Sequence, residues 1–324
     1  MRALVCKEFA PYDQLSVEDV PEPDLAEGMV MVDVKAAGVN YPDILLVEGK
    51  YQMKPETPFV PGMEAAGVVS AVGPGVQDVE AGQRVIVATM LGAFAEKVPA
   101  PAMQLVPMPD AMSFDEGAAL TTIYGTSYHA LKDRAALKQG ETLVVLGAAG
   151  GVGLASVQLG KAMGAKVIAC ASSADKLTVA EEAGADALIN YSEDDLKTRI
   201  RELTDGKGAD LVYDPVGGDF AEPALRATGW GARYLVVGFA AGPIPKIALN
   251  LALLNSRDIM GVFWGAWVGR NPRANAQNMK ELFDLYEAGK IKPRISAAYP
   301  LDQFRDAFGD IMGRKVKGKV VLNP

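Results

Sequence analysis

The residues with the clearest chemical meaning follow a short apolar run at residues 141–153, which read ETLVVLGAAGGVG. Residues 143–146 are typical of a buried strand, and Ala148, Gly150 and Gly153 follow with the spacing of a dinucleotide-binding fingerprint whose first glycine is alanine. Small residues let the backbone approach a pyrophosphate, and the next helix offers free N–H groups and its positive dipole end. The same pattern also suits a tight strand-to-helix turn without a ligand.

The residues that end the second strand of such a motif choose between the two nicotinamide cofactors, because an acid there accepts a hydrogen bond from the ribose 2′-OH. This chain has Ser172, Ser173 and Lys176 at that place, and their hydroxyls and cation favour the 2′-phosphate of NADPH. Asp175 leaves an alternative open. As a helix N-cap it would point away, but if it turned inward the preference for NADH would return. The two serines also suit a plain turn or cap.

Alternating helices and strands position these residues. Ser113 and Glu116 form a capping-box pattern that starts a long helical segment. Further on, the expected helices cover residues 154–163, 176–183, 193–204, 220–227 and 250–255, and the expected strands cover 143–146, 166–171, 187–190, 210–213, 233–238 and 258–263. Near-continuous apolar strands that alternate with helices are typical of a parallel sheet covered on both faces. The fold class is therefore α/β with a doubly wound, Rossmann-type domain.

The first hundred residues have a different character, rich in valine, glycine and proline. Strand-like runs occur at 2–7, 29–36, 66–72 and 84–88, and the helical pattern is confined to Tyr41 to Glu48. Short strands with short connections predict a compact β-barrel. An amphipathic helix ends at Gly289, and strand-like runs at 294–299 and 319–322 flank a helix at 302–311. This tail is too short for a domain and is expected to rejoin the first region. We therefore expect a discontinuous domain, 1–125 with 268–324, around a second domain at 126–267.

Composition excludes several classes of protein. The 324 residues carry a net charge of -8 without a block of like charges, which argues against nucleic-acid and membrane partners. No signal peptide and no apolar run of ~18 residues is present, so we expect a cytoplasmic protein. Cys6 and Cys170 lie in apolar runs typical of buried strands, and His129 is the single histidine. We expect His129 to be a structural residue on a helix face.

Five segments together resemble one known family: AAGVNYPD, PFVPGMEAAGVVSAVG, GAAGGVG, VYDPVGG and GVFWGAW. The chain resembles the medium-chain dehydrogenase/reductase superfamily, and within it the zinc-free quinone oxidoreductase-like branch. The likeness spans nearly the whole chain. It implies a GroES-like β-barrel domain completed by the C-terminal tail, a Rossmann domain, and an active site in the cleft between them.

The resemblance also bears on metal chemistry. Zinc-dependent members of the superfamily have a cysteine ligand after AGV and a histidine in a Gly-His-Glu triplet, whereas this chain has Asn40 and Tyr41 at the first place and Gly62-Met63-Glu64 at the second. Asparagine and methionine do not replace thiolate and imidazole around a catalytic zinc ion. We therefore expect no metal. Alcohol oxidation would then lack a means to stabilise an alkoxide, whereas reduction of a quinone or an α,β-unsaturated carbonyl compound needs less help.

The resemblance assigns residues to NADPH one by one: Asn40 and Thr126 to the nicotinamide end, Gly150, Gly151 and Val152 to the pyrophosphate, Ser173, Lys176 and Tyr191 to the 2′-phosphate, Phe239 and Phe263 to the flanks of the nicotinamide, and Arg314 and Lys319 to basic contacts from the tail. It also implies a homodimer paired through the edge strand at 258–263.

The proton donor stays open. Leu45 stands where bacterial quinone reductases place a tyrosine, which leaves Tyr41 and Tyr51 as candidates. Tyr41 suits a wall of the substrate site better than an acid, since a phenol with a pKa near 10 is a poor one. Asp43 either caps the helix that follows or orients a neighbour. Water is a further source of the proton.

The leading hypothesis is an NADPH-dependent reductase of quinones or small enones that works without a metal. An acryloyl-CoA or enoyl-thioester reductase is the alternative within the same chemistry, and its carrier would need basic residues such as Lys50, Lys54, Arg270 and Arg273. A third hypothesis, from another class, is an NADPH-binding sensor or RNA-binding protein without physiological turnover. The acidic balance speaks against RNA, because phosphate contacts need clustered cations.

Overall fold

The chain divides into two compact units in a computed structural model that describes residues 1–324. Unit 1 is Met1–Thr122 with Pro293–Pro324, and unit 2 is Ile123–Lys292. The expected boundary at residue 268 is therefore wrong by 25 residues. The reason is packing within unit 2: the Tyr128 hydroxyl donates to Glu281 Oε2 at 2.6 Å, and Asn278 Nδ2 donates to Asp133 Oδ2 at 2.8 Å.

Unit 1 is built on a seven-stranded sheet in which the C-terminal strand pairs with the N-terminal region. Its strands are β3 (Met29–Val39), β4 (Glu64–Val72), β5 (Arg84–Ala88), β6 (Lys97–Pro101), β7 (Leu105–Pro107), β14 (Ile295–Pro300) and β15 (Lys319–Asn323). The order is β14-β15-β3-β4-β5-β7, with β6 also paired to β3, and only β14 and β15 run parallel. The tail thus completes the first region, as the sequence predicts.

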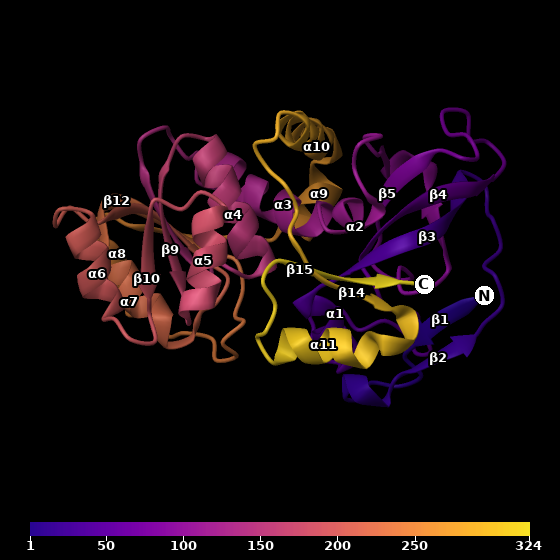
Figure 1. The fold of residues 1–324 in the computed structure, drawn as a ribbon, viewed down its shortest axis with the longest axis horizontal. Helices are drawn as coiled ribbons and strands as arrows, with labels where there is room; N and C mark the ends of the chain where they lie inside the picture. Colours follow the sequence, from indigo (N-terminus) through magenta and orange to yellow (C-terminus); the bar gives the residue numbers. More distant parts are fainter. The chain divides into compact units, whose positions relative to one another are not determined.

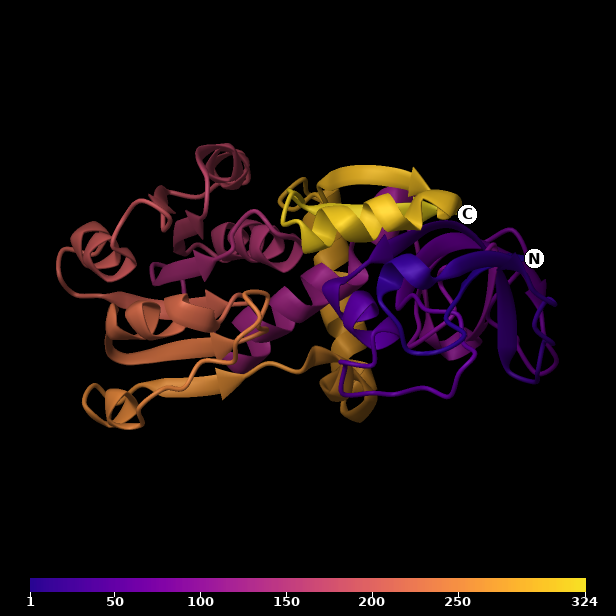
Figure 2. The same cartoon turned by 90° about the horizontal axis from the view of Figure 1, so that it is seen from below.

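Smaller elements cover this sheet. The strands β1 (Arg2–Val5) and β2 (Ser16–Asp19) form a two-stranded antiparallel pair. The helices of unit 1 are α1 (Tyr41–Val47), α2 (Phe114–Ala118) and α11 (Phe304–Met312), with 3-10 turns η1 (Tyr12–Gln14), η2 (Ala102–Gln104) and η5 (Leu301–Gln303). Helix α11, yellow in Figure 2, runs alongside β14 and buries Phe304 and Phe308 in the core of the unit. The strands β2, β6 and β7 and the three 3-10 turns were not predicted.

Unit 2 contains a six-stranded, all-parallel sheet in the order β10-β9-β8-β11-β12-β13. The strands are β8 (Thr142–Leu146), β9 (Lys166–Ala171), β10 (Ala187–Asn190), β11 (Ala209–Asp214), β12 (Thr228–Val236) and β13 (Asp258–Gly261). Its central strand β8 is buried from Leu143 to Leu146, as expected of a sheet covered on both faces. The predicted doubly wound domain is confirmed.

The helices of unit 2 lie on both faces of this sheet. Figure 1 shows α4 and α5 on one face and α6 and α7 on the other. The helical elements are α3 (Thr121–Tyr128), which begins at the end of unit 1, η3 (His129–Arg134), α4 (Gly151–Ala162), α5 (Ala174–Glu182), α6 (Leu196–Leu203), η4 (Gly218–Phe220), α7 (Ala221–Arg226), α8 (Asn250–Leu253), α9 (Trp264–Arg270) and α10 (Pro272–Glu287). None combines the length and apolarity that crossing a bilayer requires.

The helical segment that begins at Ser113 is capped as predicted but is not continuous. Ser113 Oγ accepts from Glu116 N at 3.2 Å, and Glu116 Oε2 accepts from Ser113 N at 3.0 Å, which closes the capping box. The segment then divides into α2, α3 and the π-helical turn η3, in which Ala135 N donates to Ala130 O at 2.9 Å. Single π-helical turns often occur near functional sites.

Candidate cofactor and active site

The turn between β8 and α4 uses three glycines for three purposes. Gly147 has φ +60°, the left-handed region that glycine adopts at little cost. Gly150 is the N-cap of α4 and has open space around it, since a Cβ there would come no closer than 3.4 Å to Gly147 O. At Gly153 a Cβ would lie 2.2 Å from Gly147 O, so only glycine lets the helix approach the strand this closely. Gly147 was missed in the sequence, although it belongs to the same run.

Helix α4 presents free N–H groups at this turn. Its hydrogen bonds begin with Leu154 N donating to Gly150 O at 2.8 Å, so the N–H groups of Gly151, Val152 and Gly153 have no partner within the helix. Together with the helix dipole they favour an anionic group. The open N-cap and these donors fit the pyrophosphate of a dinucleotide.

The end of β9 brings the predicted hydroxyls and cation together. Lys176 Nζ donates to Ser172 Oγ at 3.3 Å, and Ser173 Oγ donates to Asp175 Oδ1. Ser173, not Asp175, is the N-cap of α5, and Asp175 lies in the first turn of the helix. The expected N-cap role of Asp175 is therefore wrong, because α5 begins at Ala174, two residues before the expected start at residue 176. The carboxylate is close enough to Ser173 to compete for its hydroxyl.

The loop after β10 lies against the same strand end. Tyr191 N donates to Ala171 O at 3.1 Å, and Ser192 Oγ donates to Ser172 O at 3.1 Å. The Tyr191 ring packs on Phe220 with 4.3 Å between ring centroids. The structure therefore places the Tyr191 backbone beside the end of β9, while the Tyr191 ring lies against Phe220.

Hydrogen bonds join helix α3 to helix α4, which follows the glycine turn. Ser127 Oγ donates to Val152 O at 3.0 Å and lies 2.9 Å from the Tyr213 hydroxyl. Tyr124 donates to Gln158 Oε1 of α4 at 2.7 Å. These bonds hold the half-buried Thr126 at a defined place relative to the turn. Sequence reasoning missed Ser127 and Tyr213, because their pairing across 86 positions leaves no local pattern.

Phe239 and Phe263 follow the ends of β12 and β13. The Phe239 ring lies against Gly217, where a Cβ would be 2.9 Å from Phe239 Cδ1. Asp214 shapes this loop: its Oδ1 accepts from Val216 N and Gly217 N, both at 2.8 Å, and its Oδ2 accepts from the Tyr234 hydroxyl at 2.6 Å. Phe263 is largely exposed and is the N-cap of α9.

Unit 1 contains a buried polar cluster made by Asn40, Glu64 and Lys319. Lys319 Nζ donates to Glu64 Oε1 at 2.6 Å and to Asn40 Oδ1, and Asn40 Nδ2 donates to Glu64 Oε1 at 2.9 Å. The side chains of Lys319 and Glu64 are 3% and 0% exposed. Gly38 leaves the necessary space, since a Cβ there would be 2.8 Å from Glu64 Oε1. We call this group the Asn40–Glu64–Lys319 cluster.

The cluster changes the interpretation of two predicted residues. Asn40 Nδ2 also donates to Gly38 O at 3.3 Å, so both amide hydrogens are engaged inside unit 1. The Lys319 ammonium is enclosed by its partners, which does not suit the expected role as a solvent-facing contact to a phosphate. Arg314, the other basic residue expected in the tail, is exposed and has φ +55° in the turn after α11.

Asp43 lies beside this cluster and is fully buried. Its Oδ2 accepts from Asn40 N at 2.7 Å, the bond of a carboxylate that caps helix α1. Its Oδ1 has no hydrogen-bond partner. Burial, opposed by the Asn40 N–H and by Lys319, raises the pKa of Asp43 to about 7. The carboxyl group therefore titrates near neutral pH.

The two candidate tyrosines are half-buried. Tyr41 is the first residue of α1, and Tyr51 follows the turn after that helix. Burial, and to a lesser extent the charge of Asp43, raises the pKa of the Tyr51 phenol. Tyr51 therefore keeps its proton more firmly than an ordinary tyrosine, and as an acid it is weaker.

The residues of unit 1 do not fit a zinc ion. An ammonium group already lies against Glu64 Oε1 and Asn40 Oδ1, where a metal would need the same oxygen atoms. No three His, Cys, Asp or Glu side chains lie together in a way that could hold a metal ion. His129 stacks on Trp267 in unit 2, and Cys6 and Cys170 are buried in or beside strands. The donor set of a catalytic zinc site is thus missing.

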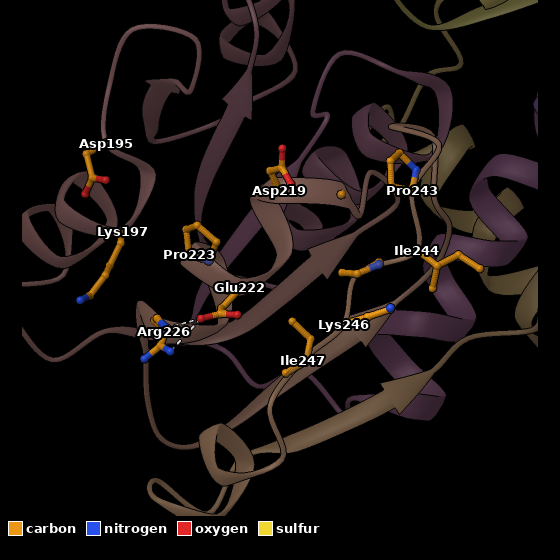
Figure 3. Close-up of a pocket in the computed structure, with 12 residues that line it drawn as sticks. Asp195, Lys197, Asp219, Glu222, Pro223, Arg226, Pro243, Ile244, Lys246 and Ile247 are labelled. Atoms are coloured by element: carbon orange, nitrogen blue, oxygen red, sulfur yellow. Dashed lines mark hydrogen bonds and ion pairs between the residues drawn. The ribbon is translucent and has the colours of Figure 1, made fainter.

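One pocket, of about 540 Å³, lies on the α6–α7 side of unit 2 (Figure 3). Lys197, Glu222, Arg226 and Lys246 contribute charged groups to it, and the Glu222–Arg226 ion pair spans part of its wall. None of the predicted site residues lines this pocket. It is therefore separate from the glycine turn and from the end of β9.

Comparison with known proteins agrees with this geometry. The alcohol dehydrogenase GroES-like domain family matches residues 26–110, and the zinc-binding dehydrogenase family matches residues 151–286. The quinone oxidoreductase-like protein 2 homolog of Nematostella vectensis is 41% identical over 326 residues, which cover 99% of this chain and 88% of that relative. The synaptic vesicle membrane protein VAT-1 homolog of Rattus norvegicus is 34% identical over 343 residues, 100% of this chain and 84% of that protein.

Among solved structures, the Escherichia coli quinone oxidoreductase complexed with NADPH superposes with a TM-score of 0.93, 31% identity and full coverage of both chains. A GroES-like β domain joined to a Rossmann sheet defines the class of this protein as a two-domain nucleotide-binding oxidoreductase. The chain belongs to the medium-chain dehydrogenase/reductase superfamily, in its quinone oxidoreductase-like branch.

Proposed function

We propose that this protein is an NADPH-dependent oxidoreductase that reduces quinones or small α,β-unsaturated carbonyl compounds without a metal ion. The observation that carries the proposal is the grouping of Ser172, Ser173 and Lys176 with Tyr191 at the end of β9. Two hydroxyls and an ammonium suit a 2′-phosphate better than a 2′-hydroxyl. The E. coli relative solved with NADPH supports the same cofactor.

In this proposal the cofactor residues of unit 2 fall into three groups, and the first is the set just named at the 2′-phosphate. Gly150, Gly151 and Val152 hold the pyrophosphate through the open N-cap and free N–H groups of α4. Thr126, Phe239 and Phe263 line the nicotinamide end. NADPH, when bound, supplies the hydride, and the protein contributes orientation and exclusion of water. Arg314 remains a proposed basic contact from the tail.

The Asn40–Glu64–Lys319 cluster takes a structural role in the proposal. It provides a buried ion pair inside unit 1, between Lys319 and Glu64, with Asn40 bound to both. Since the ammonium is held by Glu64 and Asn40, it keeps α1 and its Tyr41 and Asp43 in place rather than acting on a substrate. Quinones and enones suit such a site, because a hydrogen-bond donor and water can stabilise and protonate the substrate oxygen on which negative charge develops.

Water is the proposed source of the proton, and Tyr51 is a hydrogen-bond donor to the acceptor. The raised pKa of Tyr51 makes the phenol a weak acid but keeps it protonated, as a donor must be. Tyr41 is proposed as a wall of the substrate site. Asp43, which caps α1, acts on this site through Asn40 and not by contact with the acceptor.

The thioester alternative has less support. A CoA carrier needs free cations, but Lys50 is paired with Glu48 at 2.8 Å, and Arg270 donates to Ala266 O at 2.8 Å. Lys54 and Arg273 are the remaining candidates. Relatives named VAT-1 homolog show that the family extends beyond proteins named as oxidoreductases, which keeps a binding-only role as the third reading.

We also propose a homodimer formed through β13. This strand is the outermost of the six-stranded sheet, and Figure 2 shows it with no strand beyond it. Its Ile259 is 42% exposed, and Leu253 and Leu254 just before it are more exposed still. An unpaired apolar edge strand needs a cover, and a second copy provides one by continuing the sheet.

A panel of acceptors tests the proposed activity. NADPH oxidation is measured at 340 nm with several quinones, enones and an acryloyl-CoA ester at matched concentration, in the presence of a metal chelator. The proposal predicts turnover with at least one quinone or enone, a lower rate with the thioester and no effect of the chelator. Bound NADPH that no acceptor oxidises would support the binding-only role instead.

A further inference from the structure

Two tryptophans attach helix α9 to helix α3. Trp264 lies over Gly125, where a Cβ would come within 2.7 Å of Trp264 Cζ2. Trp267 stacks on His129 with 4.2 Å between ring centroids and 28° between the planes. Gly125 of α3 and His129, the first residue of the following turn η3, are four residues apart, and Trp264 and Trp267 of α9 are three apart, a spacing that puts neighbours on one face of a helix. We call these four residues the α3–α9 contact.

Helix α10 holds both halves of this contact. His129 Nδ1 lies 2.9 Å from Asp133 Oδ2, and Asn278 Nδ2 donates to the same oxygen at 2.8 Å. Because a carboxylate only accepts, Nδ1 is the donor, and this fixes the plane of the ring. On the other side, Trp264 Nε1 donates to Asn275 Oδ1 at 3.3 Å.

The contact matters because α9 has little else to hold it. None of its residues is buried, and Trp264 and Trp267 are only half-buried. Elements with few buried contacts open at low free-energy cost. Phe263 directly precedes Trp264 and is the N-cap of the helix, and Thr126 directly follows Gly125. The α3–α9 contact therefore sets the place of Phe263 relative to Thr126.

We propose that His129 and Gly125 are positioning residues for the nicotinamide end of the cofactor site. This inference rests on the proposed function, in which Phe263 and Thr126 line that end. The α3–α9 contact holds the two walls at the separation that a nicotinamide ring needs for hydride transfer. It has no part in binding the adenosine 2′-phosphate, which lies with Ser172, Ser173 and Lys176 at the end of β9.

The test uses a Trp230→Phe parent, because Trp230 is 78% exposed and its removal leaves only the two tryptophans of the contact as fluorophores. On this parent, His129→Ala removes the stacked ring, whereas His129→Phe keeps a ring and loses only the bond to Asp133. Gly125→Ala introduces the Cβ that meets Trp264, although alanine is the better helix former. Tryptophan emission reports whether α9 has moved.

Two ligands separate the ends of the site: NADPH, and adenosine 2′,5′-bisphosphate, which lacks the nicotinamide. We expect His129→Ala and Gly125→Ala to shift emission to longer wavelength and to lower kcat/KM about tenfold. Affinity for the bisphosphate stays within about twofold, and NADPH affinity falls more than that. His129→Phe recovers most of the loss. Equal losses for both ligands, or variants that match the parent in binding and kcat/KM, would overturn the inference.

Failure of the proposed function looks different. In that case the parent itself binds no NADPH or oxidises it with no acceptor, before any variant is compared. A parent that binds NADPH and turns over, with variants that behave like it, refutes the positioning role alone.

Discussion

At the scale of single residues, the most unusual feature is an ion pair that is wholly buried. Lys319 and Glu64 are hardly exposed, and their charges are compensated by each other, by Asn40 and by the Thr122 N–H, which donates to Glu64 Oε2 at 2.8 Å. Such pairs are weak evidence for stability, but breaking one leaves an uncompensated buried charge. The cluster therefore specifies one arrangement of β3, β4 and β15.

We expect Lys319→Met to lower the free energy of unfolding by about 3 kcal/mol or more, because Glu64 would stay buried without its partner. The double variant Lys319→Met/Glu64→Gln should recover at least about 1 kcal/mol of that loss, since the charge is gone. Denaturant unfolding measures both, with the exposed Lys35→Met as the control. If the double variant is as unstable as the sum of the single ones, the pair is not coupled as described.

Asp43 predicts a dependence of stability on pH. Its pKa is raised from 3.8 to about 7 in the folded state, mainly by burial, so the folded protein binds this proton more tightly than the unfolded chain. The stability contributed by the protonated carboxyl group is present below pH 4 and is lost as the pH rises through about 7. The free energy of unfolding of Asp43→Asn should therefore rise relative to that of the wild type by roughly 4 kcal/mol between pH 4 and pH 8.

Unfolding by denaturant at several pH values measures this difference, and the exposed Asp13→Asn provides the matched comparison. If the free energy of unfolding depends on pH in the same way for the wild type and Asp43→Asn, the pKa of the Asp43 carboxyl group is not raised on folding.

At the scale of elements, two glycines of the β8–α4 turn have different roles: Gly153 is needed for packing, and Gly150 is proposed to allow NADPH to bind. A Cβ on Gly153 would overlap Gly147 O at 2.2 Å, whereas a Cβ on Gly150 meets nothing nearer than 3.4 Å. We expect Gly153→Ala to destabilise the protein by about 2 kcal/mol or more. Gly150→Ala should unfold like the wild type but bind NADPH at least about tenfold more weakly, because the methyl group prevents close approach of the pyrophosphate.

For both variants, thermal unfolding measures the stability, and a fluorescence titration with NADPH measures the affinity for the cofactor. A Gly150→Ala protein that binds NADPH like the wild type would show that no phosphate group approaches this turn.

Elements with strong local patterns were predictable from sequence. The strands β5, β9 and β10 have the expected bounds, because each is an apolar run between clear turn residues. Helix α6 begins three residues later than expected, since Asp195 caps it by accepting from Thr198 N at 2.8 Å. The strand β6 was missed because two prolines interrupt its pattern.

The glycine turn and the residues after β9 were found because they are local in the sequence. The Asn40–Glu64–Lys319 cluster was not, since Lys319 and Glu64 lie 255 positions apart and meet only where β15 pairs with β3, next to β4. The α3–α9 contact was not predicted for the same reason, since its two halves lie more than 130 positions apart in the sequence. Patterns of neighbouring residues report the period of a helix or strand, but they do not say which distant element packs against it.

At the scale of the whole molecule, the exposed edge of the unit 2 sheet predicts association. We expect light scattering to give the mass of a dimer, and Ile259→Arg on β13 to shift it toward the monomer, because a charge on the edge opposes pairing of two strands. Ile244→Arg, at an exposed apolar residue outside β13, is the matched control and should leave the dimer intact. A monomeric wild type would contradict the proposed pairing.

The most direct test of the proposed activity is a single-turnover experiment on the protein bound to NADPH. Mixing this complex with a quinone, in the presence of a chelator, should remove one equivalent of NADPH absorbance per chain. The rate should be much lower with NADH than with NADPH. Lys176→Ala should reduce this preference for NADPH, because the variant loses affinity for NADPH and not for NADH. NADPH that stays reduced with every quinone and enone, or equal use of NADH and NADPH by the wild type, would contradict the proposal.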